Sequence, residues 1–189
     1  MSSSFSRKAA AFLTAIACIA VSATSAAAQA KSGGFTTGYT DIGPTVGLGG
    51  LNGASASFGG RFEHAIKPLP DLGNGMLGIQ VAAEYYSWSA NFANYGYSYK
   101  YIPIGVTANY HFKLDEPKID PFVGLGLGYN VVSCDGTGAF NNFSCGYSSG
   151  IYFIGRAGAR YFFSPNMALY GDVGAGGATL NIGLMFKLH

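Results

Sequence analysis

The chain closes on LNIGLMFKLH, Leu180–His189, and this stretch sets a pattern that runs through most of the sequence. Every second residue in it is large and apolar: Leu180, Ile182, Leu184, Phe186 and Leu188. Because side chains of a β-strand alternate between its two faces, the stretch predicts a strand with one apolar face and one polar, glycine-containing face. Such a strand separates an apolar environment from a polar one. The question is which of the two lies inside the fold.

The same alternation recurs in seven earlier segments that are separated by turn signals. The predicted strands are 42–51, 54–67, 76–88, 99–112, 119–132, 149–163, 168–175 and 180–189. The connections after the second, fourth and sixth strands are the turns PLPDLGNG, KLDEPK and SPNM, whereas those after the third and fifth are longer and richer in Gly, Asn and Tyr. We therefore predict an all-β fold, an eight-stranded antiparallel up-and-down transmembrane β-barrel, although the short connections after strands one and seven fit less well.

Residues 1–30 are predicted to be a secretory signal peptide that precedes a barrel domain at 31–189. Arg7 and Lys8 come before the apolar run AAAFLTAIACIAVSA, and AQA at 28–30 matches the A-x-A cleavage pattern. Two alternatives stay open: an uncleaved membrane anchor, for which the apolar run is short, and lipoprotein processing at Cys18, where the preceding AIA is a poor lipobox.

Charged residues make up only 11% of the chain, against about 25% in a typical soluble domain. Without the predicted signal peptide, the chain has nine Lys and Arg residues and nine Asp and Glu residues, so its formal net charge is near zero. No basic excess remains that would indicate a nucleic-acid partner.

The strand charges all share the face opposite the large apolar residues. They are Arg61, Glu63, Glu84, Arg156, Arg160, Asp172 and Lys187. A soluble barrel would turn this face outward, and an outer-membrane barrel would turn it inward. The polar face has many glycines and few charges, a narrow interior needs small residues opposite long ones, and large aromatics lie toward the strand ends of the apolar face. These features favour the membrane barrel.

Inside so narrow a barrel, charges must pair, because an unpaired buried charge costs several kcal/mol. We therefore expect the seven charged residues to form an interlocking ion-pair network that fills the lumen. The alternative is that they line a selective pore.

The signal peptide, the eight amphipathic strands and the closing strand together resemble the small OmpA/OmpX-type outer-membrane β-barrels. In that family the last strand carries a signal for the barrel-assembly machinery, and Asn181, Gly183, Phe186 and Leu188 fill its places. The family usually ends on Phe, whereas this chain has Leu188 followed by His189, so recognition is expected to be retained but weaker. The resemblance implies a Gram-negative outer-membrane location, contact with outer-membrane lipids, and handling by periplasmic chaperones and the assembly machinery.

Cys134 and Cys145 both fall in the predicted loop 133–148. An exported protein passes through an oxidising compartment, so we expect a disulfide between them; metal binding is the alternative, but no histidine is near.

The function expected from the sequence is non-enzymatic. It is a structural, envelope-stabilising or surface-contact role, with SANFANYGYSYK and SCDGTGAFNNFSCG as the candidate contact loops and no cofactor or metal. The surface ligand cannot be named from the sequence. The alternatives are a narrow porin-like channel and a lipid-modifying enzyme, for which His64 has outward parity but sits near a strand end.

Overall fold

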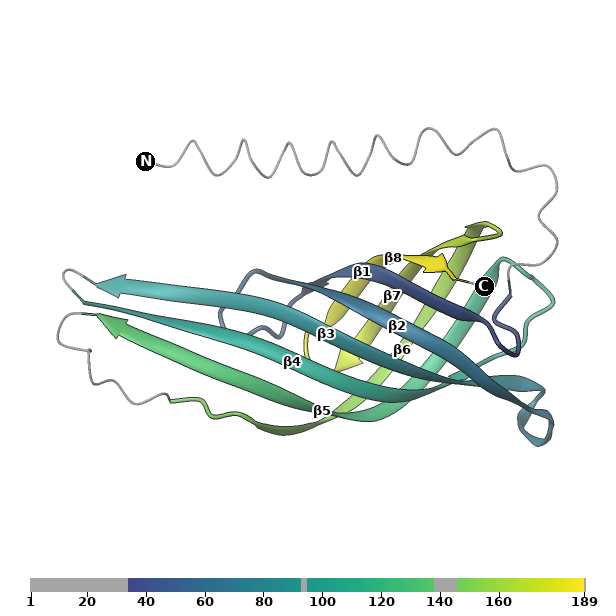
Figure 1. Ribbon diagram of the computed structural model, residues 1–189, viewed down its shortest axis with the longest axis horizontal. Coiled ribbons are helices and arrows are strands. Elements are labelled where there is room, and N and C mark those ends of the chain that lie inside the picture. Colours follow the sequence, from purple (N-terminus) through teal and green to yellow (C-terminus); the bar gives the residue numbers. More distant parts are fainter. Residues whose placement is uncertain (1–33, 93–94, 138–145, 189) are drawn as a thin grey trace. The chain divides into compact units, whose positions relative to one another are not determined.

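The computed structural model describes residues 34–92, 95–137 and 146–188. Within them, antiparallel strands follow one another round a closed barrel, and the last strand pairs with the first (Figure 1). The elements are β1 (Thr40–Leu48), β2 (Ala56–Leu69), the 3-10 turn η1 (Pro70–Leu72), β3 (Gly75–Phe92), β4 (Tyr95–His111), β5 (Ile119–Thr137), β6 (Gly150–Ser164), β7 (Met167–Ala175) and β8 (Leu180–Lys187). This confirms the predicted eight-stranded up-and-down barrel. The predicted signal peptide and Cys18 lie outside the described residues. No helix in the described part of the chain is long and apolar enough to cross a membrane.

The strands are staggered, as closure of a barrel requires. The ladder partners that lead from β2 once round the barrel and back to β2 are Ser57, Gly47, Asn181, Asp172, Gly158, Phe122, His111, Met76 and Pro68. Ser57 and Pro68 are eleven positions apart, and one position is the extra residue of a β-bulge between Ala65 and Lys67, so the net stagger is ten residues. For eight strands this corresponds to a strand tilt of about 40°. The tilt brings residues from distant strands to the same depth.

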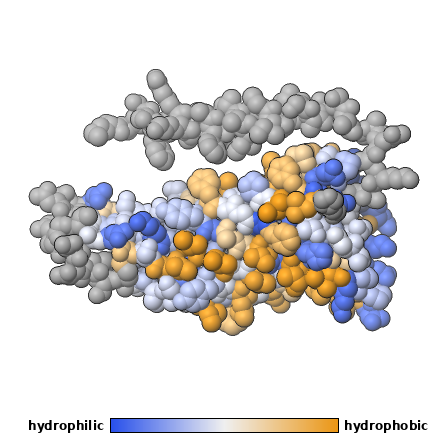
Figure 2. All heavy atoms as spheres, in the orientation of Figure 1, coloured by the Kyte–Doolittle hydropathy of each residue, from blue (hydrophilic) through white to orange (hydrophobic). Residues whose placement is uncertain are grey.

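The outer face of the barrel exposes many large apolar side chains, and Figure 2 shows them as orange clusters on the face that it presents. We call this surface the apolar belt, and its members are Ile42, Phe58, Phe62, Val81, Tyr85, Ile102, Ile104, Val106, Val123, Leu125, Leu127, Tyr129, Val131, Ile151, Phe153, Tyr161, Phe163, Leu169, Val173, Ile182 and Phe186. On β4 the outward residues from Ile102 to Phe112 are all uncharged. That stretch rises about 33 Å along the strand, or about 25 Å along the barrel axis at the tilt above.

The belt ends along one line across three strands. Ser87, Lys100 and Ser133 are ladder partners and point outward. The next outward residue on the belt side of each is apolar: Tyr85, Ile102 and Val131, respectively. Beyond this line β3, β4 and β5 continue past the other strands (Figure 1). We call residues 87–92, 95–100 and 133–137 the extended end. The opposite rim, the turn end, carries η1 and the turns at 112–118 and 165–166.

Two predicted boundaries were wrong. Residues 89–92 and 95–98, predicted as parts of a loop, belong to β3 and β4 and pair from Ser89↔Ser98 to Phe92↔Tyr95. Residues 133–137 of the second predicted loop extend β5 along β4. The loop-like composition was misleading because, across the ladder, Tyr99 stacks on Trp88 and Tyr97 packs edge-on against it, and these contacts hold the extended strands together.

The first strand ends at Leu48 instead of 51. Gly49 and Gly50 have φ of +72° and +69°, which leaves the extended conformation and turns the chain.

Candidate functional site

The interior of the barrel holds the charged residues, and Arg160 of β6 is the centre of its turn-end half. This side chain is fully buried. Its guanidinium forms ion pairs with Asp41 at 3.1 Å, with Asp120 at 3.1 Å and with Glu63. The guanidinium carbon also lies 5.0 Å from the ring centre of Phe35 and 5.6 Å from that of Phe122. The ring centre of Tyr170 lies at 5.7 Å, so three carboxylates and three aromatic rings surround one arginine.

His111 of β4 joins two of these carboxylates. Its Nε2 lies 2.8 Å from Glu63 Oε1, and its Nδ1 lies 2.9 Å from Asp120 Oδ2. The ring stacks on Phe35, with ring centres 3.7 Å apart and an interplanar angle of 13°. Because an ionised carboxylate can only accept hydrogen bonds, these contacts require either a doubly protonated imidazole or a proton on one carboxyl group.

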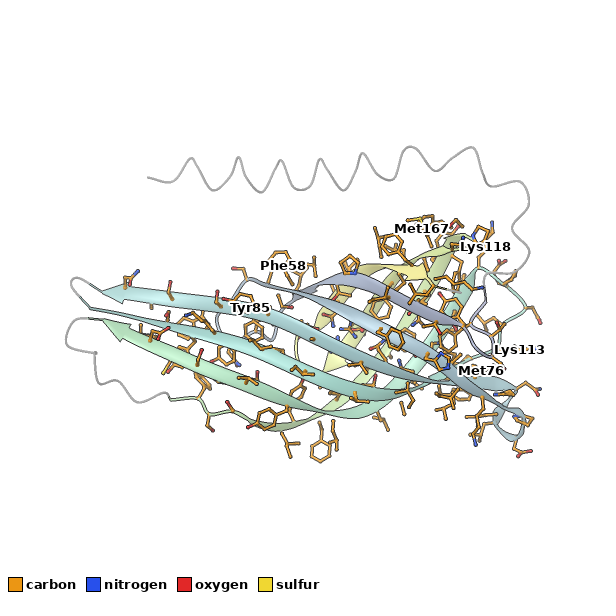
Figure 3. The ribbon with its side chains drawn as sticks, in the orientation of Figure 1. Phe58, Met76, Tyr85, Lys113, Lys118 and Met167 are labelled. Atoms are coloured by element: carbon orange, nitrogen blue, oxygen red, sulfur yellow. The ribbon has the colours of Figure 1, made fainter. Side chains whose placement is uncertain are left out.

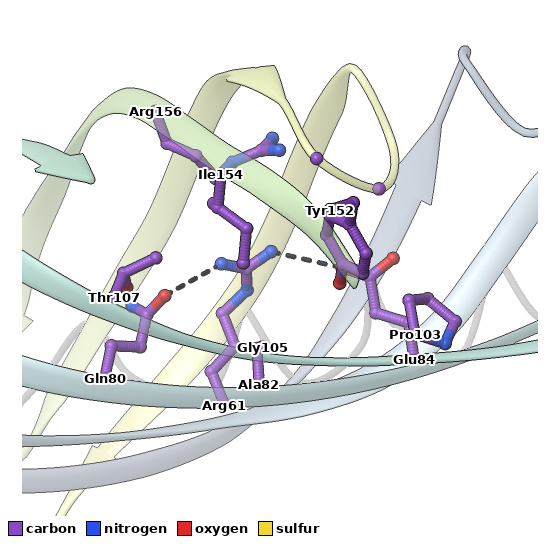
Figure 4. A pocket seen from close by; sticks show the side chains of 12 residues that line it. Arg61, Gln80, Ala82, Glu84, Pro103, Gly105, Thr107, Tyr152, Ile154 and Arg156 are labelled. Carbon is purple, nitrogen blue, oxygen red and sulfur yellow. Dashed lines mark hydrogen bonds and ion pairs between the residues drawn. The ribbon is translucent and has the colours of Figure 1, made fainter. Parts of the chain in front are cut away.

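Amide side chains carry the network toward the other half of the barrel. Gln80 donates to Glu63 Oε2 at 3.1 Å and accepts from Arg61 Nη1 at 3.0 Å, and Asn109 donates to Glu63 Oε1 at 2.9 Å. Arg61 then forms ion pairs with Glu84 at 3.2 Å and with Asp172 at 3.0 Å. The dashed lines in Figure 4 show Arg61 bound to Gln80 and to Glu84.

Arg156 of β6 closes the network near the extended end. Its Nε donates to Asp172 Oδ1 at 2.5 Å, and its Nη1 donates to the carbonyl of Ala178 at 2.9 Å. Asn181 donates to the same Asp172 oxygen at 3.0 Å, and Ser57 donates to Glu84 at 2.9 Å. Charged and neutral groups thus alternate along the barrel interior from β1 to β8.

The structure brings six of the seven sequence-predicted network residues together: Arg61, Glu63, Glu84, Arg156, Arg160 and Asp172. Lys187 forms no ion pair with a described residue. Its ammonium lies 5.5 Å from the ring centre of Tyr39 instead, at the turn end.

Sequence reasoning missed Asp41, Asp120 and the part played by His111. Strand parity could have found them, because Asp41 shares a face with Thr45, and Asp120 and His111 are on the polar faces of their strands. With them, the network of described interior residues holds three arginines and five carboxylates. The protonation state of His111 therefore changes the net charge of this network.

Inward glycines make room for these long side chains. A β-carbon at Gly78 would lie 2.5 Å from Glu63 Oε1 and 2.9 Å from the ring of Phe35, and one at Gly124 would collide with the amide of Asn109. At these positions of the polar faces, glycine is needed because a larger residue would collide with the side chains of the network.

Around the charged network the interior is tightly packed. A cavity of about 20 Å³ lies beside Arg61, Glu84 and Arg156 (Figure 4), which is room for about one water molecule. At the turn end, Phe35, Tyr39, Phe122, Phe162 and Met185 pack into a buried cluster across the barrel. This cluster closes the lumen on that side.

A second aromatic cluster begins at the rim of the extended end. Tyr86 stacks on Tyr101 with ring centres 4.7 Å apart, and Trp88 stacks on Tyr99 at 5.2 Å. Outward of these rings the surface is polar, as the side chains in Figure 3 show, and Lys100 pairs with Asp135 at 3.0 Å. The hydrogen bond and negative charge of Asp135 raise the pKa of the exposed Lys100 ammonium.

The remaining predicted residues fall in several places. Cys134 is disulfide-bonded, whereas Cys145 lies outside the described residues. His64 hydrogen-bonds Thr40 at 2.7 Å near the turn end. Of the predicted assembly signal, Asn181 and Gly183 point inward, and Phe186 and Leu188 point outward. Within the described part of the chain, no cluster of His, Cys, Asp and Glu is arranged to hold a metal ion.

Comparisons with known proteins found likeness in structure alone. No family model matches the chain, and a search of curated proteins found no match. Fourteen chains of solved structures match. One is Ail, the attachment invasion locus protein of Yersinia pestis, at 15% identity over 80% of this chain and 96% of that chain, with a TM-score of 0.49. Ail in complex with the heparin analogue sucrose octasulfate matches at 12% identity over 80% and 96%, with a TM-score of 0.47. Neisserial surface protein A matches at 16% identity over 79% and 96%, with a TM-score of 0.44. Likeness at this level carries no argument about what this chain binds or does.

Proposed function

We propose that the chain is an integral outer-membrane β-barrel that works without catalysis, as a structural and surface-contact protein. The observation that carries this proposal is the inversion of the barrel: the apolar belt is exposed, and the charged residues are inside. A belt of about 25 Å matches the lipid-facing band of outer-membrane barrels. In water such a surface would be a large exposed apolar patch, which soluble proteins avoid.

The extended end faces the outside in this proposal, and the turn end faces the periplasm. Outer-membrane barrels have short periplasmic turns and longer outer loops. The turns at 112–118 and 165–166 fit the first pattern, and the continuation of β3, β4 and β5 fits the second.

Surface contact would be made by the extended end. It is a sheet instead of a set of free loops, and ring stacking across β3 and β4 stiffens it. We propose that a Cys134–Cys145 disulfide ties the segment after β5 to this sheet. A preformed sheet loses little conformational entropy when it binds a partner, which suits it to adhesion-like contact.

The lumen is proposed to be closed. Ion pairs and the turn-end cluster fill it, and the cavity beside Arg61 holds about 20 Å³. This favours a structural role for the network over the alternative of a porin-like channel.

Biogenesis is proposed to follow the usual route of such barrels, with periplasmic chaperones and the barrel-assembly machinery as partners. Asn181, Gly183, Phe186 and Leu188 would form the signal that the machinery reads. Outer-membrane lipids would then surround the apolar belt.

Cell fractionation and unboiled gels test the proposal. We expect the protein in the outer-membrane fraction, with a mobility that shifts on boiling, as folded barrels show. Recovery in the soluble periplasmic fraction without a mobility shift would overturn the proposed location and with it the proposed role.

A further inference from the structure

A vestibule of about 350 Å³ opens at the rim of the barrel, on the side of the extended end. Pro103, Tyr152, Gly176 and Gly177 line both this vestibule and the small cavity beside Arg61, so the two spaces adjoin at these residues; Figure 4 labels Pro103 and Tyr152. One wall is backbone: Gly176 and Gly177, with φ of +91° and +101°, form the tip of the short β7–β8 connection. The volume is near the lower end of the range for small-ligand sites, about 300–1,000 Å³.

The lining of the vestibule is neutral. Among the described residues it includes the phenol rings of Tyr86 and Tyr152, the amides of Asn52 and Asn130, and no charged side chain. The nearest arginines do not supply a charge, because Arg61 and Arg156 are already paired with Glu84 and Asp172. This argues against an anionic or cationic ligand.

One buried polar atom in the lining has no partner. The amide oxygen Oδ1 of Asn130 is buried and accepts no hydrogen bond from the described protein. Buried acceptors are nearly always satisfied, so this oxygen needs a donor from water or from a ligand. A ligand that fits must therefore be neutral, donate a hydrogen bond, and offer an apolar face to the tyrosines.

We propose that the vestibule binds one neutral sugar ring. A sugar hydroxyl would donate to the Asn130 oxygen once the side chain turns it toward the vestibule, other hydroxyls would contact the glycine backbone, and the C–H face of the ring would lie on Tyr152. The wall at Gly176 and Gly177 lets the ring approach because it has no side chains. The proposal adds a ligand class to the surface-contact role and rests on that role only for access from outside.

The ring can come from two sources. Ile151 and Phe153 border the vestibule and also belong to the apolar belt, with 76% and 83% of their surfaces exposed. A glycolipid head group in the outer leaflet would reach the vestibule past these side chains, whereas a soluble saccharide would enter from the solvent.

Amide chemical shifts measured by NMR test the proposal on the folded protein in lauryldimethylamine oxide, a detergent without sugar. The soluble probes are methyl glycosides of glucose, galactose, mannose and N-acetylglucosamine, and the membrane-borne probes are the octyl glycosides of the same sugars. We expect saturable shifts at Asn130, Tyr152, Gly176 and Gly177 with at least one of them. Saturation with methyl glycosides indicates a soluble source, and saturation with octyl glycosides alone indicates a lipid-borne one.

Three variants make the result specific. Asn130→Ala removes the acceptor and should weaken binding roughly three- to tenfold, the range for one lost hydrogen bond. Ser148→Trp places a large ring over the vestibule from an exposed position and should abolish binding. Ser89→Trp, at an exposed position on β3 away from the lining, is the control and should leave binding unchanged.

No saturable shift with any probe, or equal shifts in the wild type and in Ser148→Trp, would overturn the proposal. Because the measurement is made in detergent, such a failure would leave the proposed outer-membrane location standing.

Discussion

Replacing Leu125 with arginine places a charge at the middle of the apolar belt. Leu125 is the fourth of the seven outward residues from Ile119 to Val131 on β5 and has 74% of its surface exposed. Its ladder partners, Ala108 and Gly155, are too small to shield a long side chain. If the belt faces lipid, arginine here should cost about 2–4 kcal/mol, which lowers the folded-to-unfolded ratio roughly 30- to 1,000-fold.

Ile151→Arg is the matched control. Ile151 has 76% of its surface exposed, almost the same as Leu125, but it is the first outward residue of β6 and lies at the edge of the belt. Arginine near the membrane interface costs only about 0–1 kcal/mol. The two variants therefore differ in depth and hardly at all in exposure.

Equilibrium unfolding by urea in phospholipid vesicles measures both costs. Trp88 is the single tryptophan and stacks on Tyr99, so its fluorescence should report loss of the fold. We expect Leu125→Arg to be less stable than Ile151→Arg by about 2 kcal/mol or more. In a water-exposed barrel neither substitution would cost much, so equal stability of the two variants would refute the inverted arrangement.

Three further predictions concern the interior and the extended end. Arg160→Met leaves Asp41, Glu63 and Asp120 without their shared cation and should cost about 3–5 kcal/mol in the same unfolding measurement; a cost below about 1 kcal/mol would contradict the buried network. The wild-type protein should show no stable conductance steps in planar bilayers, and sizeable steps would show that the lumen is open. The unreduced protein should contain no titratable thiol at Cys134 or its expected partner in the chain, and two titratable thiols would reject the proposed disulfide.

The faces of the strands could be predicted from the sequence because parity is a local property. Val106 and Thr107 are neighbours, and their alternation places one on the belt and the other in the interior, as the structure has them. Strand ends were harder to predict, because they depend on partners. Residues 89–92 and 95–98 look like a loop in isolation and become strand through cross-strand ring contacts, which no local pattern reports.

The members of the charged network could be predicted in the same way, but their partners could not. Arg160 of β6 meets Glu63 of β2, and which residues share a depth depends on the ten-residue stagger of the whole barrel. Lys187 shows the limit of parity: its face is the inward one, yet it lies near the turn end, where Tyr39 is its neighbour and no described carboxylate pairs with it.

The arrangement of the barrel also narrows where a partner can be recognised. A belt that faces lipid needs uncharged outward residues, and an interior filled by ion pairs needs its polar groups satisfied by one another. The belt offers no charge to a ligand, and the polar groups of the interior, including the few without a hydrogen-bond partner such as Asp41 Oδ1 and Thr107 Oγ1, are buried away from solvent. The exceptions lie beyond the line of Ser87, Lys100 and Ser133 and in the vestibule at the same rim, where Asn130 keeps an unpartnered oxygen. Substitutions that alter binding without altering stability should therefore fall in this rim, and substitutions in the network should alter stability first.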